Sequence, residues 1–136
     1  MEAFQKKILV TNEDLDELKH VNNVRYVQWI QDISKEHWDK LTTAAIQEKV
    51  IWVVLNHNID YKSAAVLGDE ILLKTYIESS KGALSIRVVE MFNNQTQELL
   101  VKSKTKWCLL NPDTLKPIRI SEEIRSLFIN VTKYPS

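Results

Sequence analysis

Residues 24 to about 42 form the one long stretch whose apolar positions follow a helical spacing, and they include neither glycine nor proline. The side chains that recur three or four positions apart are Tyr26, Ile30, Ile33, His37 and Leu41. This pattern predicts a helix of about 19 residues, which would be about 28 Å long. Since Val27, Trp29 and Trp38 widen the apolar surface, we expect a sheet to wrap around this helix.

After the helix the pattern changes to a period of two, which predicts β-strands. The predicted strands span residues 50–61, 70–79, 84–92 and 97–110, and a first strand spans residues 3–11. Two short polar links, Lys81-Gly82 and residues 93–96, are typical of hairpin turns. Because short links favour antiparallel pairing, we expect an antiparallel meander after the helix.

The strand at residues 50–61 begins with an uninterrupted apolar run and alternates only afterwards. This pattern predicts a central strand that is buried on both faces at one end. Further on, residues 111–114 have the composition of a turn. Ser121 is suited to cap a short C-terminal helix, with Glu122 and Glu123 in its first turn.

Composition and charge limit the kinds of partner and the cellular location that we expect for this chain. The 136 residues suit one domain, and the 18 basic and 18 acidic residues give no net charge, so we expect no nucleic-acid partner. We also expect no membrane partner, because no apolar run could span a bilayer and residues 1–7 lack the apolar core of a signal peptide. The single cysteine, Cys108, cannot form an internal disulfide, which favours a cytoplasmic location.

The most informative stretch lies directly before the helix and contains Asp14, Asp16, His20, Asn22 and Asn23. Either asparagine is a good N-cap, because its amide oxygen can accept a hydrogen bond from the first turn. The free N–H groups and the positive end of the helix dipole favour a developing negative charge at this place. A carboxylate, a histidine and preset N–H donors are groups suited to acyl transfer.

These residues resemble the signature of hotdog-fold acyl-CoA thioesterases of the 4-hydroxybenzoyl-CoA thioesterase-like family, and also a stretch of plant acyl-ACP thioesterases. The matching residues are Asp14, Asp16, His20, Val21, Asn22, Asn23, Tyr26 and Trp29. The resemblance continues at residues 60–65 and at Gly68-Asp69-Glu70. It implies an α+β hotdog fold, in which an antiparallel sheet of about five strands wraps a long central helix. It also implies a homodimer or homotetramer with the active site at the subunit interface.

The resemblance assigns roles to several residues. It implies that Asp16 is the catalytic carboxylate and that His20 lies near the thioester. The chain departs from the family at Leu18, where the plant enzymes have asparagine, and at Lys19, where the bacterial enzymes usually have glycine. We expect Asn23, Tyr26 and Lys62 to contribute to substrate binding, Lys62 by its charge; Lys81 is a second candidate for the CoA phosphates.

The resulting hypothesis is a thioesterase that hydrolyses an acyl-CoA to a free acid and CoA. Asp16 would act either as a general base on water or as a nucleophile that forms a mixed anhydride, and the sequence leaves both open. We expect no metal and no cofactor, since positioning and charge stabilisation suffice for this reaction. Three alternatives remain: an acyl-ACP thioesterase, a hotdog hydratase or dehydratase, and a non-catalytic acyl-CoA-binding module.

Other chemically active side chains have plainer interpretations. Asp14 and Asp16 could be capping acids, and His37 on the apolar helix face is expected to be a buried histidine. His57 and Asp60 lack a third ligand at metal spacing, so we expect no zinc site there. Cys108 lies in an apolar strand and is expected to be a small buried group rather than a nucleophile.

Overall fold

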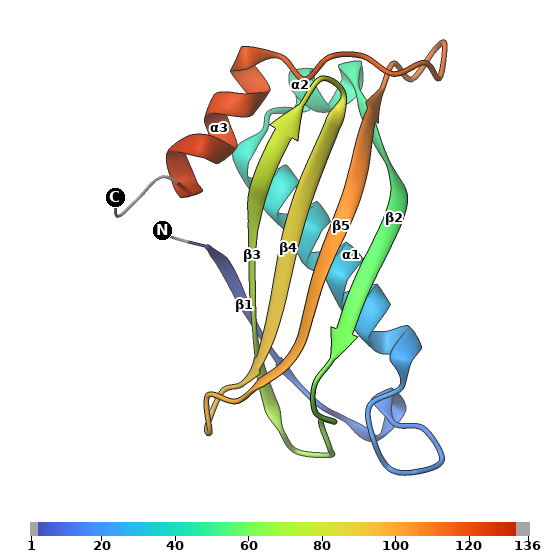
Figure 1. Ribbon diagram of the computed structural model, residues 1–136, viewed down its shortest axis with the longest axis vertical. Helices are drawn as coiled ribbons and strands as arrows, with labels where there is room; N and C mark the ends of the chain where they lie inside the picture. Colours follow the sequence, from blue (N-terminus) through green and yellow to red (C-terminus); the bar gives the residue numbers. More distant parts are fainter. Residues whose placement is uncertain (1–2, 133–136) are drawn as a thin grey trace.

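One antiparallel sheet wraps around a long helix (Figure 1). The computed structural model describes residues 3–132, and within that range the sheet has five strands. In chain order the elements are β1 (Phe4–Leu9), the short 3-10 helix η1 (Asn12–Asp14), α1 (Asn23–Leu41), α2 (Ala44–Lys49), β2 (Ile51–Tyr61), β3 (Glu70–Lys81), β4 (Leu84–Asn93), β5 (Leu99–Leu110) and α3 (Glu122–Thr132). The predicted α+β class, with a long helix and about five antiparallel strands, is confirmed.

The strand order is β1-β3-β4-β5-β2, so the meander comprises only β3, β4 and β5. The prediction that residues 50–61 form a central strand is wrong, because β2 pairs only with β5 and lies at an edge of the sheet. Its apolar run is partly uncovered in the single chain: Ile51 is 37% and Leu55 is 55% exposed. The pattern of β2 reflects how apolar its side chains are, whereas strand order depends on long-range pairing that the pattern does not encode.

The helix α1 begins where the Asn22 side chain accepts a hydrogen bond from the backbone N–H of Val24 (3.0 Å). This cap decides between the two asparagines, because Asn23 is already the first helical residue. The predicted apolar face is buried against the sheet, and its buried residues are Tyr26, Trp29, Ile30, Ile33, Ser34 and His37. The six-residue helix α2, capped by Thr43, was not predicted, since so short an element has no clear period.

Among the described residues, the core has two apolar clusters and a band of buried polar side chains. The first cluster lies around the N-terminal half of α1 and includes Ile30, Leu73 and Met91, while the second joins Leu109 to Phe128 of α3. The band consists of buried polar side chains on α1 and the inner face of the sheet: His37, Thr75, Arg87, Ser103 and Thr105. The interior is therefore not uniformly apolar.

The C-terminal helix α3 packs on the end of the sheet that is remote from η1 (Figure 1). The predicted cap is confirmed, because the Ser121 hydroxyl accepts a hydrogen bond from the backbone N–H of Ile124 (3.2 Å). Within residues 3–132, no helix combines the length and the apolar character needed to cross a membrane.

Candidate active site

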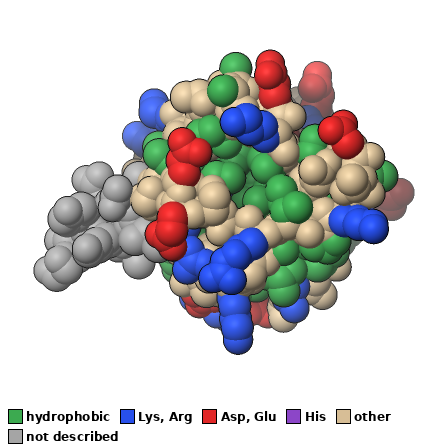
Figure 2. Space-filling view, turned by 90° about the horizontal axis from the view of Figure 1, so that it is seen from above, with side chains coloured by type: hydrophobic (Ala, Val, Ile, Leu, Met, Phe, Trp, Pro, Cys, Tyr) green, Lys and Arg blue, Asp and Glu red, His purple; other side chains and the backbone are tan. Residues whose placement is uncertain are grey.

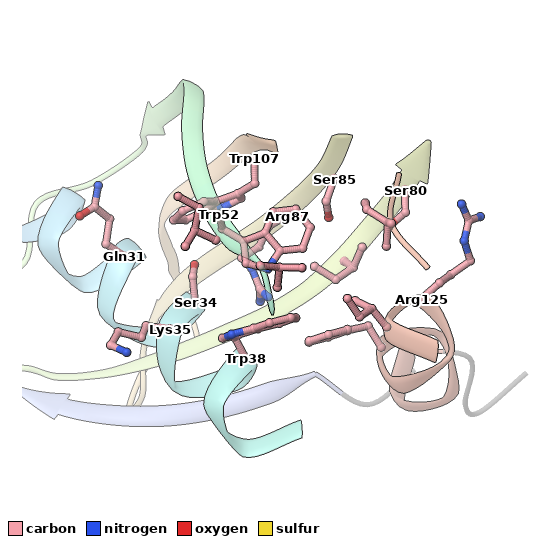
Figure 3. Close-up of a pocket in the computed structure, with 16 residues that line it drawn as sticks. Gln31, Ser34, Lys35, Trp38, Trp52, Ser80, Ser85, Arg87, Trp107 and Arg125 are labelled. Atoms are coloured by element: carbon pink, nitrogen blue, oxygen red, sulfur yellow. The ribbon is translucent and has the colours of Figure 1, made fainter. Parts of the chain in front are cut away.

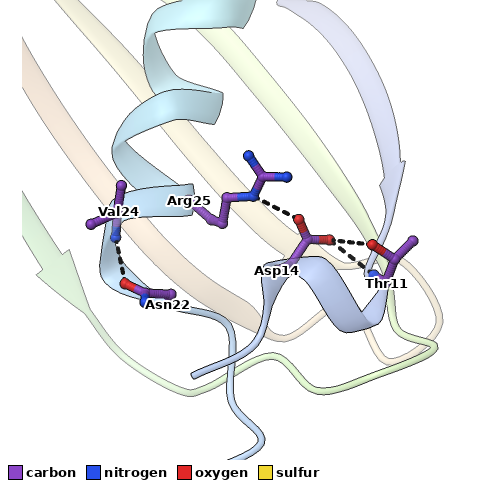
Figure 4. Close-up of polar contacts among 5 residues, drawn as sticks. All are labelled: Thr11, Asp14, Asn22, Val24 and Arg25. Carbon is purple, nitrogen blue, oxygen red and sulfur yellow. Dashed lines mark hydrogen bonds and ion pairs between the residues drawn. The ribbon is translucent and has the colours of Figure 1, made fainter. Parts of the chain in front are cut away.

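The carboxylates of Asp14 and Asp16 have different environments although they are two residues apart. Asp14 is buried (5% exposed) and accepts hydrogen bonds from Arg25 Nε (2.8 Å) and from the backbone N–H of Thr11 (2.9 Å) (Figure 4). These contacts tie the segment before η1 to the first turn of α1. Asp14 therefore has the structural role that a capping acid would have.

Asp16 lies in a tight loop that closes on itself. Its backbone N–H donates to the carbonyl of His20 (2.8 Å), and its carbonyl accepts from the N–H of Lys19 (3.1 Å). Its side-chain Oδ1 accepts hydrogen bonds from the backbone N–H groups of Leu18 (2.9 Å) and His20 (3.2 Å). Oδ2 has no donor among the residues that the structure describes, so the carboxylate is oriented and keeps one oxygen unengaged.

The loop requires a left-handed backbone at Lys19, whose φ is 65°. The bacterial thioesterases that this motif resembles usually have glycine here, the residue that adopts a positive φ without steric cost. For a residue with a β-carbon this conformation costs about 1–2 kcal/mol. At this strained position the backbone N–H groups of Lys19 and of the following His20 both donate hydrogen bonds to Asp16.

Tyr26 connects the start of α1 to the segment after β2. Its side chain is buried (3% exposed), and its hydroxyl accepts a hydrogen bond from the backbone N–H of Ala65 (3.2 Å). Burial raises the pKa of Tyr26 above its usual value, so the phenol keeps its proton at neutral pH. That proton is available for donation to a ligand, because the Ala65 contact uses only a lone pair of the oxygen.

A pocket of about 230 Å³ lies where the loop that contains Asp16 meets the end of β2. It is lined by Asp16, His20, Val21, Asn23, Tyr26, Tyr61, Lys62, Ser63 and Ala64. The structure thus brings together five of the six residues for which we predicted a catalytic or substrate-binding role, all except Lys81. Asp16 is half-buried there, and His20, Asn23 and Lys62 are exposed at its surface.

Lys81 does not join this pocket. It ends β3 at the β3–β4 hairpin, at the opposite end of the sheet from the loop that contains Asp16 (Figure 1). Conversely, Tyr61, Ser63 and Ala64 line the pocket although we had assigned them no role. The signal that could have identified them was the continued resemblance at residues 60–65, which lies close to Asp16 only after folding.

His37 and Cys108 are both buried, as the sequence predicts. His37 is 1% exposed and Cys108 is 5% exposed, and neither lines the pocket. His57 Nδ1 lies 2.8 Å from Thr105 Oγ1. Within the described part of the chain, no three His, Cys, Asp or Glu side chains are grouped so that they could hold a metal ion.

Comparison with known proteins places this arrangement in a family. Residues 1–128 match the sequence profile of the acyl-ACP thioesterase N-terminal domain. The chain belongs to this family. It is also similar to the long-chain acyl-CoA thioesterase FadM of Escherichia coli, with 23% identity over 135 residues that cover 96% of this chain and 100% of FadM.

Solved structures of thioesterases share the fold. A thioesterase of Thermus thermophilus in complex with coenzyme A and zinc superposes with a TM-score of 0.85 at 22% identity, over 100% of both chains. The 12:0-ACP thioesterase of Umbellularia californica has a TM-score of 0.80 at 17% identity, over 94% of this chain and 49% of the plant chain. The fold is therefore the hotdog fold, and the protein is a hotdog-fold thioesterase. Family membership favours thioester hydrolysis over the hydratase and the non-catalytic binding module that the sequence had left open.

Proposed function

We propose that this thioesterase hydrolyses an acyl-CoA to a free carboxylic acid and CoA, with Asp16 as the catalytic carboxylate. The observation that carries the proposal is the asymmetry of that carboxylate. Oδ1 is held by two backbone N–H groups, whereas Oδ2 has no donor among the described residues, and Asp16 lines the pocket. A general base or a nucleophile needs such an oriented and partly unengaged oxygen.

Two routes fit this geometry. In the first, Oδ2 takes a proton from water while the water oxygen attacks the thioester carbon, and the C–S bond breaks as the proton passes to the CoA sulfur. In the second, Oδ2 attacks the carbonyl carbon itself, CoA leaves, and water hydrolyses the mixed anhydride to regenerate Asp16. Both routes place negative charge on the thioester oxygen in the transition state.

The start of α1 supplies a donor for that oxygen. The N–H of Val24 is engaged by the Asn22 cap, while the N–H of Asn23 has no acceptor among the described residues. Asn23 also lines the pocket and stands at the positive end of the helix dipole. We assign its backbone N–H to the polarisation of the thioester carbonyl.

Three further side chains would hold the substrate. The Tyr26 hydroxyl and the His20 ring can each form a hydrogen bond with the thioester or with the attacking water. The Lys62 ammonium group, exposed beside the pocket, is suited to the CoA phosphates. His20 therefore has an orienting role in this proposal, and Lys62 a binding role.

The edge strand β2 supports a proposal for assembly. A free strand edge with exposed apolar side chains can pair with a second copy, which would remove the edge. Two-fold antiparallel pairing of β2 would bring Tyr61 and Lys62 of one subunit near Ile51 of the other. The pocket would then lie beside the interface of a homodimer, or of a tetramer made of two such dimers.

The carrier of the acyl group has a second candidate. The family description and the plant relative both name acyl-ACP, and the same carboxylate chemistry would act on either thioester. Acyl-CoA remains the first candidate because FadM, which matches over its full length, is an acyl-CoA thioesterase.

The direct test measures the free thiol that the protein releases from a panel of acyl-CoA substrates and from acyl-ACP substrates with the same acyl groups. We expect turnover of at least one acyl-CoA, and an about hundredfold or greater loss of kcat in Asp16→Asn, in the range for a positioned acid–base group. Lys106→Gln, a change on the outer face of β5, is the control and should keep wild-type kcat. Wild-type turnover in Asp16→Asn would exclude Asp16 as the catalytic carboxylate, and release from acyl-ACP alone would reassign the carrier.

A further inference from the structure

A second cavity, of about 340 Å³, lies between α1, α3 and the inner face of the sheet (Figure 3). Its volume is within the range of about 300–1,000 Å³ that is typical of small-molecule sites. Most of its wall is apolar, and three of the four tryptophans of the chain, Trp38, Trp52 and Trp107, line it. Among the described residues, none lines both this cavity and the pocket that contains Asp16.

Arg87 of β4 contributes a buried positive charge to this cavity. Its side chain is 5% exposed, and none of the ion pairs among the described residues involves it. Nη1 donates a hydrogen bond to Thr75 Oγ1 (2.9 Å) and lies 2.9 Å from His37 Nδ1. Nε and Nη2 have no acceptor among the described residues.

His37 does not neutralise Arg87. Burial and the neighbouring guanidinium lower the pKa of His37 to about 3, so the imidazole is neutral and accepts from Arg87 through Nδ1. Burial also lowers the pKa of Arg87, to about 9, which leaves the guanidinium charged at neutral pH. Among the described residues, no anionic side chain compensates this buried cation.

This arrangement is costly for the folded protein alone. A buried charge without a counter-ion is unfavourable, and an apolar side chain of similar volume at such a position is often neutral or stabilising. The described residues that line the cavity include no aspartate or glutamate. The buried Nε1 of Trp107, in the cavity wall, also has no hydrogen-bond acceptor among the described residues. The N–H of Trp107 can donate to a hydrogen-bond acceptor, and the guanidinium of Arg87 favours an acceptor that is anionic.

The other two cations of the cavity lie at its rim. The head groups of Lys35 and Arg125 point outward, while the guanidinium of Arg87 lies near the middle of the lining side chains (Figure 3). Lys35 pairs with Asp39 (3.2 Å) and Arg125 lies 3.7 Å from Glu122. Seen from this end of the molecule, hydrophobic side chains gather at the centre of the surface and charged ones lie around them (Figure 2).

We propose that this cavity binds an apolar chain or ring that ends in a carboxylate, with the carboxylate on Arg87 and the apolar body among the tryptophans. A guanidinium binds a carboxylate through paired hydrogen bonds, and Nε with Nη2 offers the required edge. The carboxylate could belong to a free carboxylic acid or to the distal end of an acyl group. The binding does not depend on hydrolysis at Asp16.

The test is the affinity for decanoate, measured by calorimetry and by tryptophan fluorescence, with decanol as the uncharged ligand of equal length. We expect the wild-type protein to bind decanoate about tenfold or more tightly than decanol, in the range for hydrogen bonds to charged groups. Arg87→Met should remove this preference without lowering Tm. The control, Lys106→Met, removes a cation on β5 that points to the opposite face of the sheet, since it alternates with buried Thr105.

Several outcomes would overturn the proposal. The wild-type protein could fail to bind decanoate, or it could bind decanoate and decanol equally, and neither measurement needs a variant. If Arg87→Met does not fold, Arg87→Gln keeps a donor for Thr75 and removes the charge, and it should also lose the preference for decanoate. A Tm loss in both variants without any change in ligand preference would assign Arg87 to structure alone.

The two sources of the carboxylate are separated by kinetics. If the carboxylate is the distal end of an acyl group, Arg87→Met lowers kcat/KM for an ω-carboxydecanoyl-CoA but not for decanoyl-CoA. If it belongs to a free acid, the variant treats both esters as the wild type does, and only inhibition or activation by added decanoate is lost. Absence of all thioester hydrolysis would count against the proposed function, while decanoate binding would still decide whether the cavity takes a carboxylate.

Discussion

At the scale of single residues, Asp14 and Asp16 illustrate how two like side chains acquire different roles. We expect Asp14→Asn to lower the free energy of unfolding by about 1–3 kcal/mol, because it weakens the buried contacts to Arg25 and Thr11. Asp16→Asn should unfold close to the wild-type temperature, since its side chain binds only two N–H groups of its own loop. Thermal and urea unfolding of the two variants would measure this, and a larger loss of stability in Asp16→Asn would contradict it.

His37 gives the protein a pH dependence of stability. The pKa of its imidazole is about 3 in the folded state, against 6.5 for an exposed histidine, so below pH 6.5 the unfolded chain binds a proton that the folded chain does not. The free energy of unfolding should therefore fall as the pH drops from 6.5 towards 3, by at most about 1.4 kcal/mol per pH unit from this group. This stabilising contribution is present above pH 6.5.

The measurement is urea unfolding at several pH values between about 7 and 4, for the wild type and for His37→Gln. The glutamine variant is expected to be less stable at neutral pH, because it loses ring contacts with Phe4 and Phe128. Its stability should nevertheless fall less steeply on acidification than that of the wild type. Parallel curves for the two proteins would show that His37 is not the titrating group.

Most of the candidate site could be predicted from the sequence, because its acidic residues, its histidine and its asparagines all lie in the short segment before α1. Asn22 and Asn23 were interchangeable in the sequence, and only the hydrogen bond from Val24 shows that Asn22 is the cap. The left-handed Lys19 and the contribution of Tyr61 depend on how the loop closes and on where β2 ends. Arg87 was not identified at all, since a single cation within a strand has no signal in its spacing.

At the scale of elements, the helical period predicted α1, and the apolar patterns of the other segments predicted all five strands within a few residues. They could not predict strand order, because β2 and β3 are consecutive in the chain but lie on opposite sides of β4 and β5. The short helix α2 is stabilised locally by its Thr43 cap and has too few residues for a recognisable period.

The helix α3 offers a test of helix capping, and it also contributes to the wall of the cavity that contains Arg87. Ser121→Ala removes the acceptor for the Ile124 N–H and should lower the free energy of unfolding by about 1 kcal/mol. Because Ile124 and Phe128 of α3 line the cavity, fluorescence of the tryptophans should also change. Ser121→Asp, which retains a capping oxygen, is the control and should keep wild-type stability; equal losses in both variants would show that the cap does not stabilise α3.

At the scale of the whole molecule, the strands at the two sides of the sheet, β1 and β2, differ in apolar exposure. Among the described residues, β1 exposes one large apolar side chain, Leu9 at its end, whereas β2 exposes three along its length, Ile51, Leu55 and Tyr61. A continuous sheet across two copies would cover such side chains and pair the open backbone groups of β2. It would also place the start of one β2 beside the end of the other, where Tyr61 and Lys62 line the pocket.

We therefore expect a dimer or tetramer at micromolar concentration, measured by size-exclusion chromatography with light scattering. Leu55→Lys introduces a charge on the β2 edge and should shift the population towards monomer, with a parallel loss of thioesterase activity. Leu115→Lys is the matched control, because Leu115 is similarly exposed (63% against 55%) but lies in the loop after β5. A wild-type monomer with full activity would exclude a site that depends on a second subunit, and dissociation of Leu115→Lys instead would place the interface at the loop after β5.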